Sequence, residues 1–176
     1  MLIVFGGLPG TGKTTIGRAL ARRLGAFHLR IDTIEQAIRA AGGADDPVGP
    51  QGYLVAYALA GDNLGLGATV VADSVNPIRV TREAWRATAL RAGVPLVEVE
   101  IVCSDPAEHR HRVETRHSDI AGHRPPSWAA VVGRTYEPWD EADAVVDTAG
   151  RDVDACVAAI LAVLPTRPLH GSGRRP

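Results

Sequence analysis

Residues 7–14 of this chain read GLPGTGKT and fit the pattern G-x-x-x-x-G-K-[ST] at every position. The pattern follows an apolar run at residues 2–5, and that run predicts a buried strand. A triphosphate needs several hydrogen-bond donors that converge on it, and a glycine-rich turn lets backbone N–H groups approach without a Cβ in the way. The spacing therefore predicts a binding site for a nucleoside triphosphate.

The last two residues of this pattern add chemistry of their own. Lys13 supplies a positive charge for the β- and γ-phosphates, and Thr14 supplies a hydroxyl to a Mg²⁺ ion. Apolar residues recur at helical spacing up to Gly25, which predicts a helix that begins at Lys13 and points the positive end of its dipole at the same anion. We expect the nucleotide to be bound by Gly7, Gly10, Thr11, Gly12, Lys13, Thr14 and Thr15.

Asp32 stands at the carboxyl end of the second predicted strand, residues 27–31. Open α/β sheets place their ligands at this end of the strands. A carboxylate there can accept a proton from an attacking hydroxyl and direct its oxygen at the γ-phosphorus, so we expect Asp32 to be catalytic and to contact the substrate. Aspartate is also a favoured cap for a following helix, and both roles can hold at once.

Asp73 ends the third predicted strand, residues 68–73, which should lie next to the first. Mg²⁺ tends to keep several waters, so we expect this carboxylate to face the metal, directly or through a bound water. Asp73 and Thr14 are the predicted metal site. The alternative is that Asp73 only caps the turn that leads into Asn76 and Pro77.

A series of arginines, Arg110, Arg112, Arg116 and Arg124, follows the fourth predicted strand. Arg112 and Arg116 are four residues apart, so in the predicted helix at residues 105–117 both guanidinium groups would project from one face. There they could close together on the triphosphate and stabilise the phosphoryl group during transfer, with Arg116 as the catalytic residue. A solvated helix face is the alternative.

The acceptor site is expected in the segments that follow the second and third strands, residues 42–61 and 74–85. Their side chains suit a polar ligand with one flat or apolar face, although core packing explains Tyr57 and Trp85 equally well. The residues expected to contact the acceptor, besides Asp32, are Tyr53, Asn76, Arg79 and Arg82.

The composition limits the partners. A formal net charge of −1 and a sequence pI near 6.6 provide no basic field for a phosphate backbone, so nucleic acid is disfavoured as a partner. The two cysteines lack C-x-x-C spacing. No apolar stretch reaches membrane length and no charged leader precedes the first strand, so we expect a cytoplasmic protein without a membrane partner. The pattern gives no information on the oligomeric state.

Strand and helix patterns alternate along the chain, which predicts an α/β domain with a parallel sheet covered on both faces. The last two strands are expected at residues 95–103 and 144–147, with helices at 79–92, 127–136 and 151–164. A single domain should span residues 1–164, with a lid at about 105–137. The tail at 165–176, rich in Pro, Gly and Arg, is expected to be disordered.

Two other classes of nucleotide-binding protein fit poorly. Residues 147–150, DTAG, match the D-x-x-G pattern of GTPases, but no N-K-x-D guanine reader follows, so this stretch predicts only a strand end and a turn. A mechanical ATPase of the AAA type should have a longer chain and a strand that ends in Asp-Glu, whereas here the third strand ends Asp73-Ser74. A compact phosphotransferase remains.

Up to about residue 164 the chain resembles the small P-loop kinases, a group that includes chloramphenicol phosphotransferase, gluconate kinase, zeta toxins and the kinase domain of polynucleotide kinase. The resemblance rests on residues 7–14, Asp32, the VVAD stretch at 70–73, and the RVETR stretch at 112–116, which is similar to an R-φ-x-x-R lid. It implies a three-layer P-loop NTPase fold, a five-stranded parallel sheet with a helical lid, ATP with Mg²⁺, and γ-phosphoryl transfer to a hydroxyl. It also implies Asp32 as the base and Arg112 and Arg116 as lid arginines.

One departure concerns the acceptor. Several relatives have an arginine three residues after the catalytic aspartate, and this chain has Glu35 there, so an anionic acceptor loses one expected anchor. A sugar, an aminoglycoside, a nucleoside and a phenicol-type alcohol all stay open. Two further functions stay open as well: a 5′-hydroxyl polynucleotide kinase, and a zeta-toxin-like or non-enzymatic nucleotide-binding protein.

Overall fold

The structure, a computed structural model, describes residues 1–42 and 48–165. The expected tail therefore lies outside the described residues from 166 onward, as does part of the loop expected at 41–52. The described strands are β1 (Leu2–Gly6), β2 (Phe27–Arg30), β3 (Val70–Asp73), β4 (Leu96–Val102) and β5 (Ala144–Asp147). The described helices are α1 (Lys13–Leu24), α2 (Ile31–Gly42), α3 (Gln51–Gly65), α4 (Arg79–Ala92), α5 (Pro106–Thr115), α6 (Trp128–Val132) and α7 (Val153–Val163).

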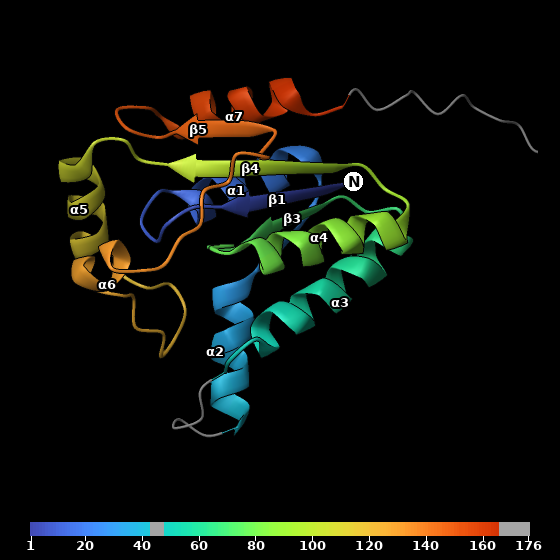
Figure 1. Ribbon diagram of the computed structural model, residues 1–176, viewed down its shortest axis with the longest axis horizontal. Coiled ribbons are helices and arrows are strands. Elements are labelled where there is room, and N and C mark those ends of the chain that lie inside the picture. The colour runs from blue at the N-terminus through green and yellow to red at the C-terminus, as the bar shows by residue number, and fades with distance from the viewer. Residues whose placement is uncertain (43–47, 166–176) are drawn as a thin grey trace, which may run out of the picture.

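All five strands are parallel and lie in the order β2-β3-β1-β4-β5. Successive side chains of a strand point to opposite faces of the sheet. Ile3 and Phe5 accordingly pack with α1 and α7, whereas Leu2 and Val4 pack with α3 and α4 on the other face. Figure 1 shows α7 above the strands and α1 behind them, with α3 and α4 below. The expected three-layer α/β fold with a five-stranded parallel sheet is confirmed.

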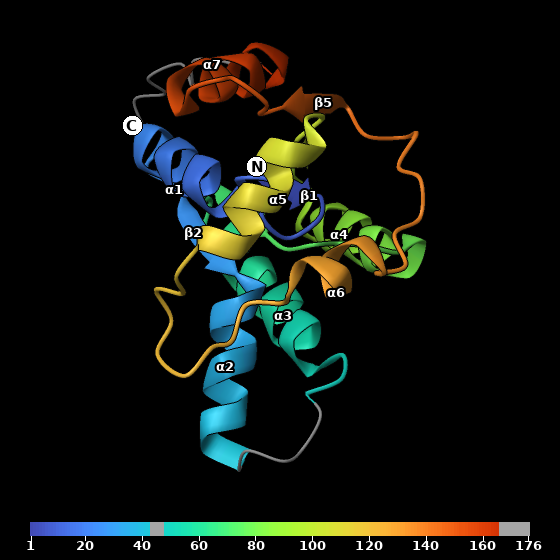
Figure 2. The same cartoon turned by 90° about the vertical axis from the view of Figure 1, so that its left-hand side faces the viewer.

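Helices α5 and α6 lie at the carboxyl ends of the strands rather than on a sheet face (Figures 1 and 2). They belong to residues 105–137, which we call the lid segment. Helix α2 extends from the same edge of the sheet, because it begins directly where β2 ends. Within the described residues, no helix combines the length and the apolar character of a membrane span.

Both helices of the lid segment end earlier than the sequence predicts. Helix α5 ends at Thr115, and Arg116 is already extended, with φ −68° and ψ 140°. Helix α6 ends at Val132, where Gly133 follows, instead of continuing to residue 136. A helix needs packing along one face to persist, and tertiary contacts rather than local propensity decide where these short helices stop.

Arg82 is a structural residue and not part of an acceptor site. It is 3% exposed, and its guanidinium lies 5.3 Å from the ring centre of Tyr136 and 4.8 Å from that of Trp139. It donates hydrogen bonds to four main-chain carbonyls, those of Asn76, Pro77, Glu137 and Pro138. The side chain thereby fastens the end of the lid segment to the start of α4, so the prediction that Arg82 contacts the acceptor is corrected.

Replacing Arg82 with methionine should lower the free energy of unfolding by about 3 kcal/mol, because it leaves buried carbonyls without donors. Urea unfolding followed by circular dichroism measures this loss. The control is Arg91→Met, an exposed arginine near the end of the same helix, which should change stability by less than about 0.5 kcal/mol. Equal effects of the two substitutions would contradict the structural role.

Candidate active site

A cavity of about 1420 Å³ opens at the carboxyl edge of the sheet. Its walls come from the glycine-rich loop at residues 7–14, the first turns of α1, α2, α3 and α4, the lid segment, and the turn after β5. Ligands of open parallel sheets bind at this edge. The cavity brings together Lys13, Thr14, Asp32, Asp73 and Arg116, which the sequence had placed in separate segments.

The glycine-rich loop has the backbone that its sequence predicts. Gly7, with φ +126°, and Gly12, with φ +98°, are in conformations that an L side chain rarely adopts, and a Cβ on Gly7 would overlap the carbonyl oxygen of Ile101. Gly12 immediately precedes α1, so the N-terminal N–H groups of this helix face the cavity side of the loop. The arrangement fits an anion with several oxygens.

Lys13 is 7% exposed, and its Nζ donates to the carbonyl of Leu8 at 2.7 Å, inside the curve of the loop. Burial lowers the pKa of its ammonium group from 10.5 to about 8, although the carboxylates of Asp73 and Asp32 oppose this change. A buried ammonium group of lowered pKa indicates a site that is short of negative charge. The phosphates of a nucleotide would supply that charge.

Asp73 is 3% exposed, and its Oδ2 lies 3.4 Å from Nε2 of His28, close enough for an ion pair but without hydrogen-bond geometry. Burial alone would raise the pKa of the Asp73 carboxyl, but His28, Lys13 and Thr14 outweigh burial and hold this pKa below its usual value. Among the described residues, Oδ2 has no hydrogen-bond partner. A buried, ionised oxygen beside a threonine hydroxyl fits a hard cation such as Mg²⁺.

Asp32 lies in the first turn of α2 and lines the cavity. Its side chain is 44% exposed, and its Oδ2 lies 3.7 Å from a guanidinium nitrogen of Arg30. Within the described part of the chain, Asp32 makes no hydrogen bond to a main-chain amide, so it does not cap α2. The carboxylate is therefore available to a ligand, with Arg30 and Arg116 nearby.

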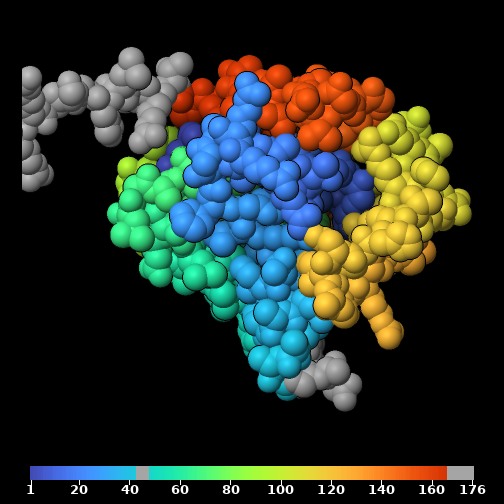
Figure 3. Space-filling model, turned by 180° about the vertical axis from the view of Figure 1, so that it is seen from behind, coloured from blue at the N-terminus to red at the C-terminus, as the bar shows by residue number. Residues whose placement is uncertain are grey.

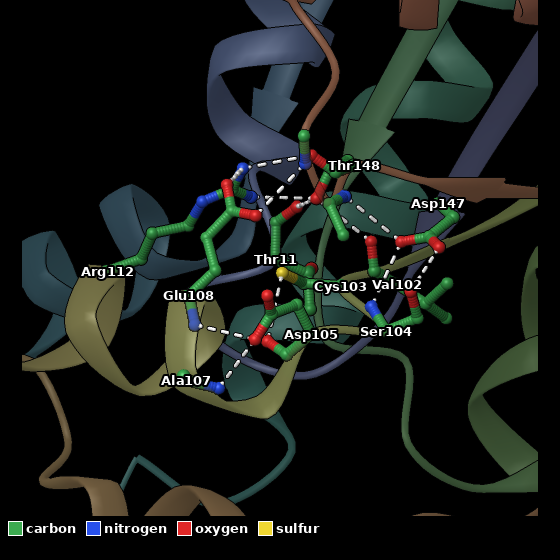
Figure 4. Close-up of polar contacts among 12 residues, drawn as sticks. Thr11, Val102, Cys103, Ser104, Asp105, Ala107, Glu108, Arg112, Asp147 and Thr148 are labelled. Atoms are coloured by element: carbon green, nitrogen blue, oxygen red, sulfur yellow. Dashed lines mark hydrogen bonds and ion pairs between the residues drawn. The ribbon is translucent and has the colours of Figure 1, made fainter.

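Arg112 and Arg116 both line the cavity but do not act from one helix face as predicted. The helix ends between them, so the expected spacing of four residues along a helix does not apply. Arg112 bonds to Glu108 and to the hydroxyl and carbonyl of Thr148, in the turn after β5 (Figure 4). Arg116 instead lies near Asp32, and burial lowers the pKa of its guanidinium although Asp32 opposes this.

Asp119 connects the loop between α5 and α6 to α1 and β2 through ion pairs. Its carboxylate pairs with Arg18 of α1 and with Arg30 at the end of β2, the latter at 2.7 Å, and these two guanidinium groups hold the pKa of Asp119 well below its usual range. Gly122 of the same loop lies so close to Gln36 that a Cβ would come within 2.9 Å of its amide nitrogen. Figure 3 shows this gold-coloured loop against the blue surface of α1 and α2. Because Arg30 also contacts Asp32, the loop and Asp32 share one arginine.

Replacing Asp119 with asparagine should speed amide hydrogen exchange of the loop at residues 116–126 severalfold, because one charged attachment to two arginines is lost. Asp119 and Arg18 are about half exposed, although Arg30 is only 12% exposed, so the stability change should stay below about 1 kcal/mol. Since folding lowers the pKa of Asp119, its contribution is present at neutral pH and is lost only as the pH falls below about 4. Glu114→Gln, which breaks an exposed pair with Arg110 on α5, is the control and should leave the exchange of this loop unchanged.

The other predicted residues divide into two groups. Tyr53 and Arg124 line the cavity, as do Gly10, Gly12 and Thr15. Asn76 and Arg79 do not: Asn76 is fully buried with φ +50° and donates its main-chain N–H to the hydroxyl of Tyr53, whereas Arg79 is 71% exposed and pairs with Glu83. Asn76 therefore positions the Tyr53 hydroxyl through this hydrogen bond. The predicted contact of Asn76 and Arg79 with the acceptor is corrected.

Sequence reasoning missed several residues at this site. His28 pairs with Asp73, and His109, 6% exposed, places Nε2 2.9 Å from the carbonyl of Pro9 while its ring packs against Trp128. Thr148 lies with its hydroxyl 3.0 Å from the carbonyl of Thr11. Each connects segments far apart in the chain; only His28, on the strand before Asp32, could have been noticed from its position.

A protein-family model described as an AAA domain matches residues 2–125. The chain belongs to this AAA domain family. The match covers the glycine-rich loop, Asp32, Asp73 and the lid arginines, and it ends within the lid segment. The sequence had disfavoured a mechanical ATPase of the AAA type. The family match describes the domain, and in this domain β3 ends at Asp73 and is followed by Ser74 rather than ending in Asp-Glu.

Several solved structures with the same fold are kinases by name. A "putative kinase" from Chloroflexus aurantiacus J-10-fl has 23% identity and a TM-score of 0.73, over 93% of this chain and 98% of the other. The Mycobacterium tuberculosis APS kinase CysC in complex with AMPPNP and APS has 18% identity and a TM-score of 0.65, over 92% and 95%. A gluconokinase from Sinorhizobium meliloti 1021 has 23% identity and a TM-score of 0.63, over 92% and 89%.

No curated protein matches this AAA domain by sequence. The family match and these structures confirm that the chain has the fold of the small P-loop kinases that it resembles. The acceptor does not follow from either comparison.

Proposed function

We propose that this protein is a kinase that transfers the γ-phosphoryl group of ATP to a hydroxyl of a small molecule. The observation that carries the proposal is the convergence of Lys13, Asp73 and Asp32 on one cavity, with an anion cradle on one side and a half-exposed carboxylate on the other. The acceptor hydroxyl would lie between them. The AMPPNP in the APS kinase structure of the same fold supports a nucleotide in such a cradle.

Each group then has one task. The glycine-rich loop and Lys13 bind the phosphates, and Asp32 accepts the proton as the acceptor oxygen forms a bond to the γ-phosphorus and the bond to the β,γ-bridging oxygen breaks, which releases ADP. Arg116 faces the charge that develops on the transferred group, and Arg112 packs over the turn after β5. Positioning and electrostatic stabilisation supply most of the rate.

Thr14 and Asp73 would hold a Mg²⁺ ion, which neutralises phosphate charge when it is bound. The described residues hold no cluster of three or more His, Cys, Asp or Glu side chains suited to a metal. One carboxylate and one hydroxyl form a donor set that Mg²⁺ accepts when waters and substrate phosphates supply the remaining ligands.

The test is ATP consumption with a panel of sugars, polyols, amino alcohols and hydroxylated antibiotics, with mass spectrometry to detect the phosphorylated acceptor. We expect at least one acceptor to raise ATP consumption well above the acceptor-free rate and to gain one phosphoryl group. Asp32→Ala should abolish this stimulation. The proposal is wrong if no acceptor stimulates turnover, or if a DNA or RNA 5′-hydroxyl is labelled instead.

A further inference from the structure

Glu35 lies on the same wall of the cavity as Asp32, one turn further along α2. Side chains three residues apart on a helix are neighbours, with Cβ atoms about 5–6 Å apart. Both carboxylates therefore face the space where the acceptor would lie.

The Glu35 carboxylate has few donors for its degree of burial. Its side chain is 23% exposed, and its nearest cationic partner, Arg39, lies 3.5 Å away. Gly52 of α3 packs so closely against Glu35 that a Cβ on Gly52 would overlap the Glu35 side chain. Burial raises the pKa of the Glu35 carboxyl even though Arg39 and Arg134 oppose this. A ligand that donates a hydrogen bond would satisfy this group, whereas a ligand carboxylate would be repelled by it.

Apolar side chains from α3 and α4 also line this cavity. Leu54 of α3 is 60% exposed and Val80 of α4 is 63% exposed, and both line the cavity together with Tyr57 and Ala84. Exposed apolar side chains grouped at the edge of a cavity fit a ligand with an apolar face. The cavity therefore presents both two acids and a hydrocarbon surface to a ligand.

We propose that Glu35 determines acceptor specificity, and that the acceptor is an uncharged or cationic alcohol with a second hydrogen-bond donor near the reacting hydroxyl and an apolar face. This proposal rests on the proposed kinase function, because it places the reacting hydroxyl at Asp32. The second donor is a hydroxyl or an amine that meets Glu35, within about 5 Å of the first. Anionic acceptors are disfavoured.

Three matched compounds test the charge preference. 1-Phenylpropane-1,2,3-triol, 3-amino-1-phenylpropane-1,2-diol and 2,3-dihydroxy-3-phenylpropanoate share a phenyl ring and a diol, and they differ only in whether the last carbon is an alcohol, an amine or a carboxylate. Their binding is measured by calorimetry in the presence of AMPPNP and their phosphorylation by mass spectrometry. The triol and the amine should bind at least roughly tenfold more tightly than the carboxylate.

Substitution then assigns the preference to Glu35. Glu35→Gln should reduce the preference for the triol and the amine over the carboxylate, and Glu35→Arg should reverse the order so that the carboxylate binds best. Glu83→Gln, on the exposed face of α4 and outside the cavity, is the control and should change nothing. AMPPNP affinity and the unfolding midpoint of each variant show that the nucleotide site and the fold are intact.

The outcomes separate this inference from the function on which it rests. If the charge order holds in binding but no compound is phosphorylated, the kinase proposal fails and the assignment of Glu35 stands. If compounds are phosphorylated but the carboxylate binds as well as the others, or Glu35→Arg leaves the order unchanged, the assignment is overturned. It is also overturned if none of the three compounds binds while AMPPNP does.

Discussion

Replacing Asp32 with asparagine should lower kcat for the acceptor-stimulated reaction by roughly 10²–10⁴-fold, the range expected when a general base is removed. Asparagine keeps the size of the side chain but cannot accept the proton of the attacking hydroxyl. Asp32 lines the cavity from α2 and is not part of the glycine-rich loop, so AMPPNP affinity should change by less than about threefold. Single-turnover kinetics with saturating ATP measure the loss directly.

Asp62→Asn is the matched control, because Asp62 is an exposed acid on α3 that does not line the cavity. It should leave kcat unchanged. A large rise in the KM for the acceptor with an unchanged kcat in Asp32→Asn would show that Asp32 only binds the acceptor. A parent-like rate would remove Asp32 from the mechanism altogether.

The fold could be predicted because its signals are local. The apolar runs of β1 and β3 alternate with amphipathic helices, and this alternation determines a parallel sheet covered on both faces. The positions of Lys13, Asp32 and Asp73 follow from the same reasoning, because residues at the carboxyl ends of adjacent parallel strands meet at one edge. The order of the strands therefore determines which of these side chains lie close together at the site.

The lid segment and the acceptor wall were predicted less well because their contacts are long-range. Arg82 and Arg116 carry the same charge in the sequence, but Arg82 is buried among the main-chain carbonyls of residues 76–77 and 137–138, whereas Arg116 lies near Asp32. Residues 137–138 and Asp32 are distant from these arginines in the sequence, so local patterns do not separate the two roles. Asp119, whose partners are 101 and 89 residues away in sequence, illustrates the same limit.

Replacing Lys13 with methionine should weaken ATP-analogue binding by at least about 100-fold, because it removes a charged donor to two phosphates worth roughly 1.5–3 kcal/mol each. The same substitution should stabilise the nucleotide-free protein. The pKa of Lys13, about 8 when folded and 10.5 when unfolded, corresponds to about 3 kcal/mol of destabilisation by the buried ammonium group. A substitution that weakens nucleotide binding but stabilises the nucleotide-free protein identifies a side chain whose burial supports ligand binding and not stability.

The pH dependence gives an independent check. Below pH 8 Lys13 is charged in the folded and in the unfolded protein, so the full cost of burying its charge applies. Between about pH 8 and 10.5 the unfolded chain binds more protons than the folded protein, so the free energy of unfolding should rise with pH in this range. Lys13→Met should not show this rise. Above pH 8 the affinity for the ATP analogue should fall by up to tenfold for each pH unit, because the deprotonated Lys13 must take up a proton when the analogue binds. Lys13 is the single lysine of the chain, so acylation of its ε-amine, followed by mass spectrometry, titrates this group alone. An acylation midpoint near 10.5, or acylation that bound nucleotide does not slow, would show that Lys13 is not buried in the nucleotide site.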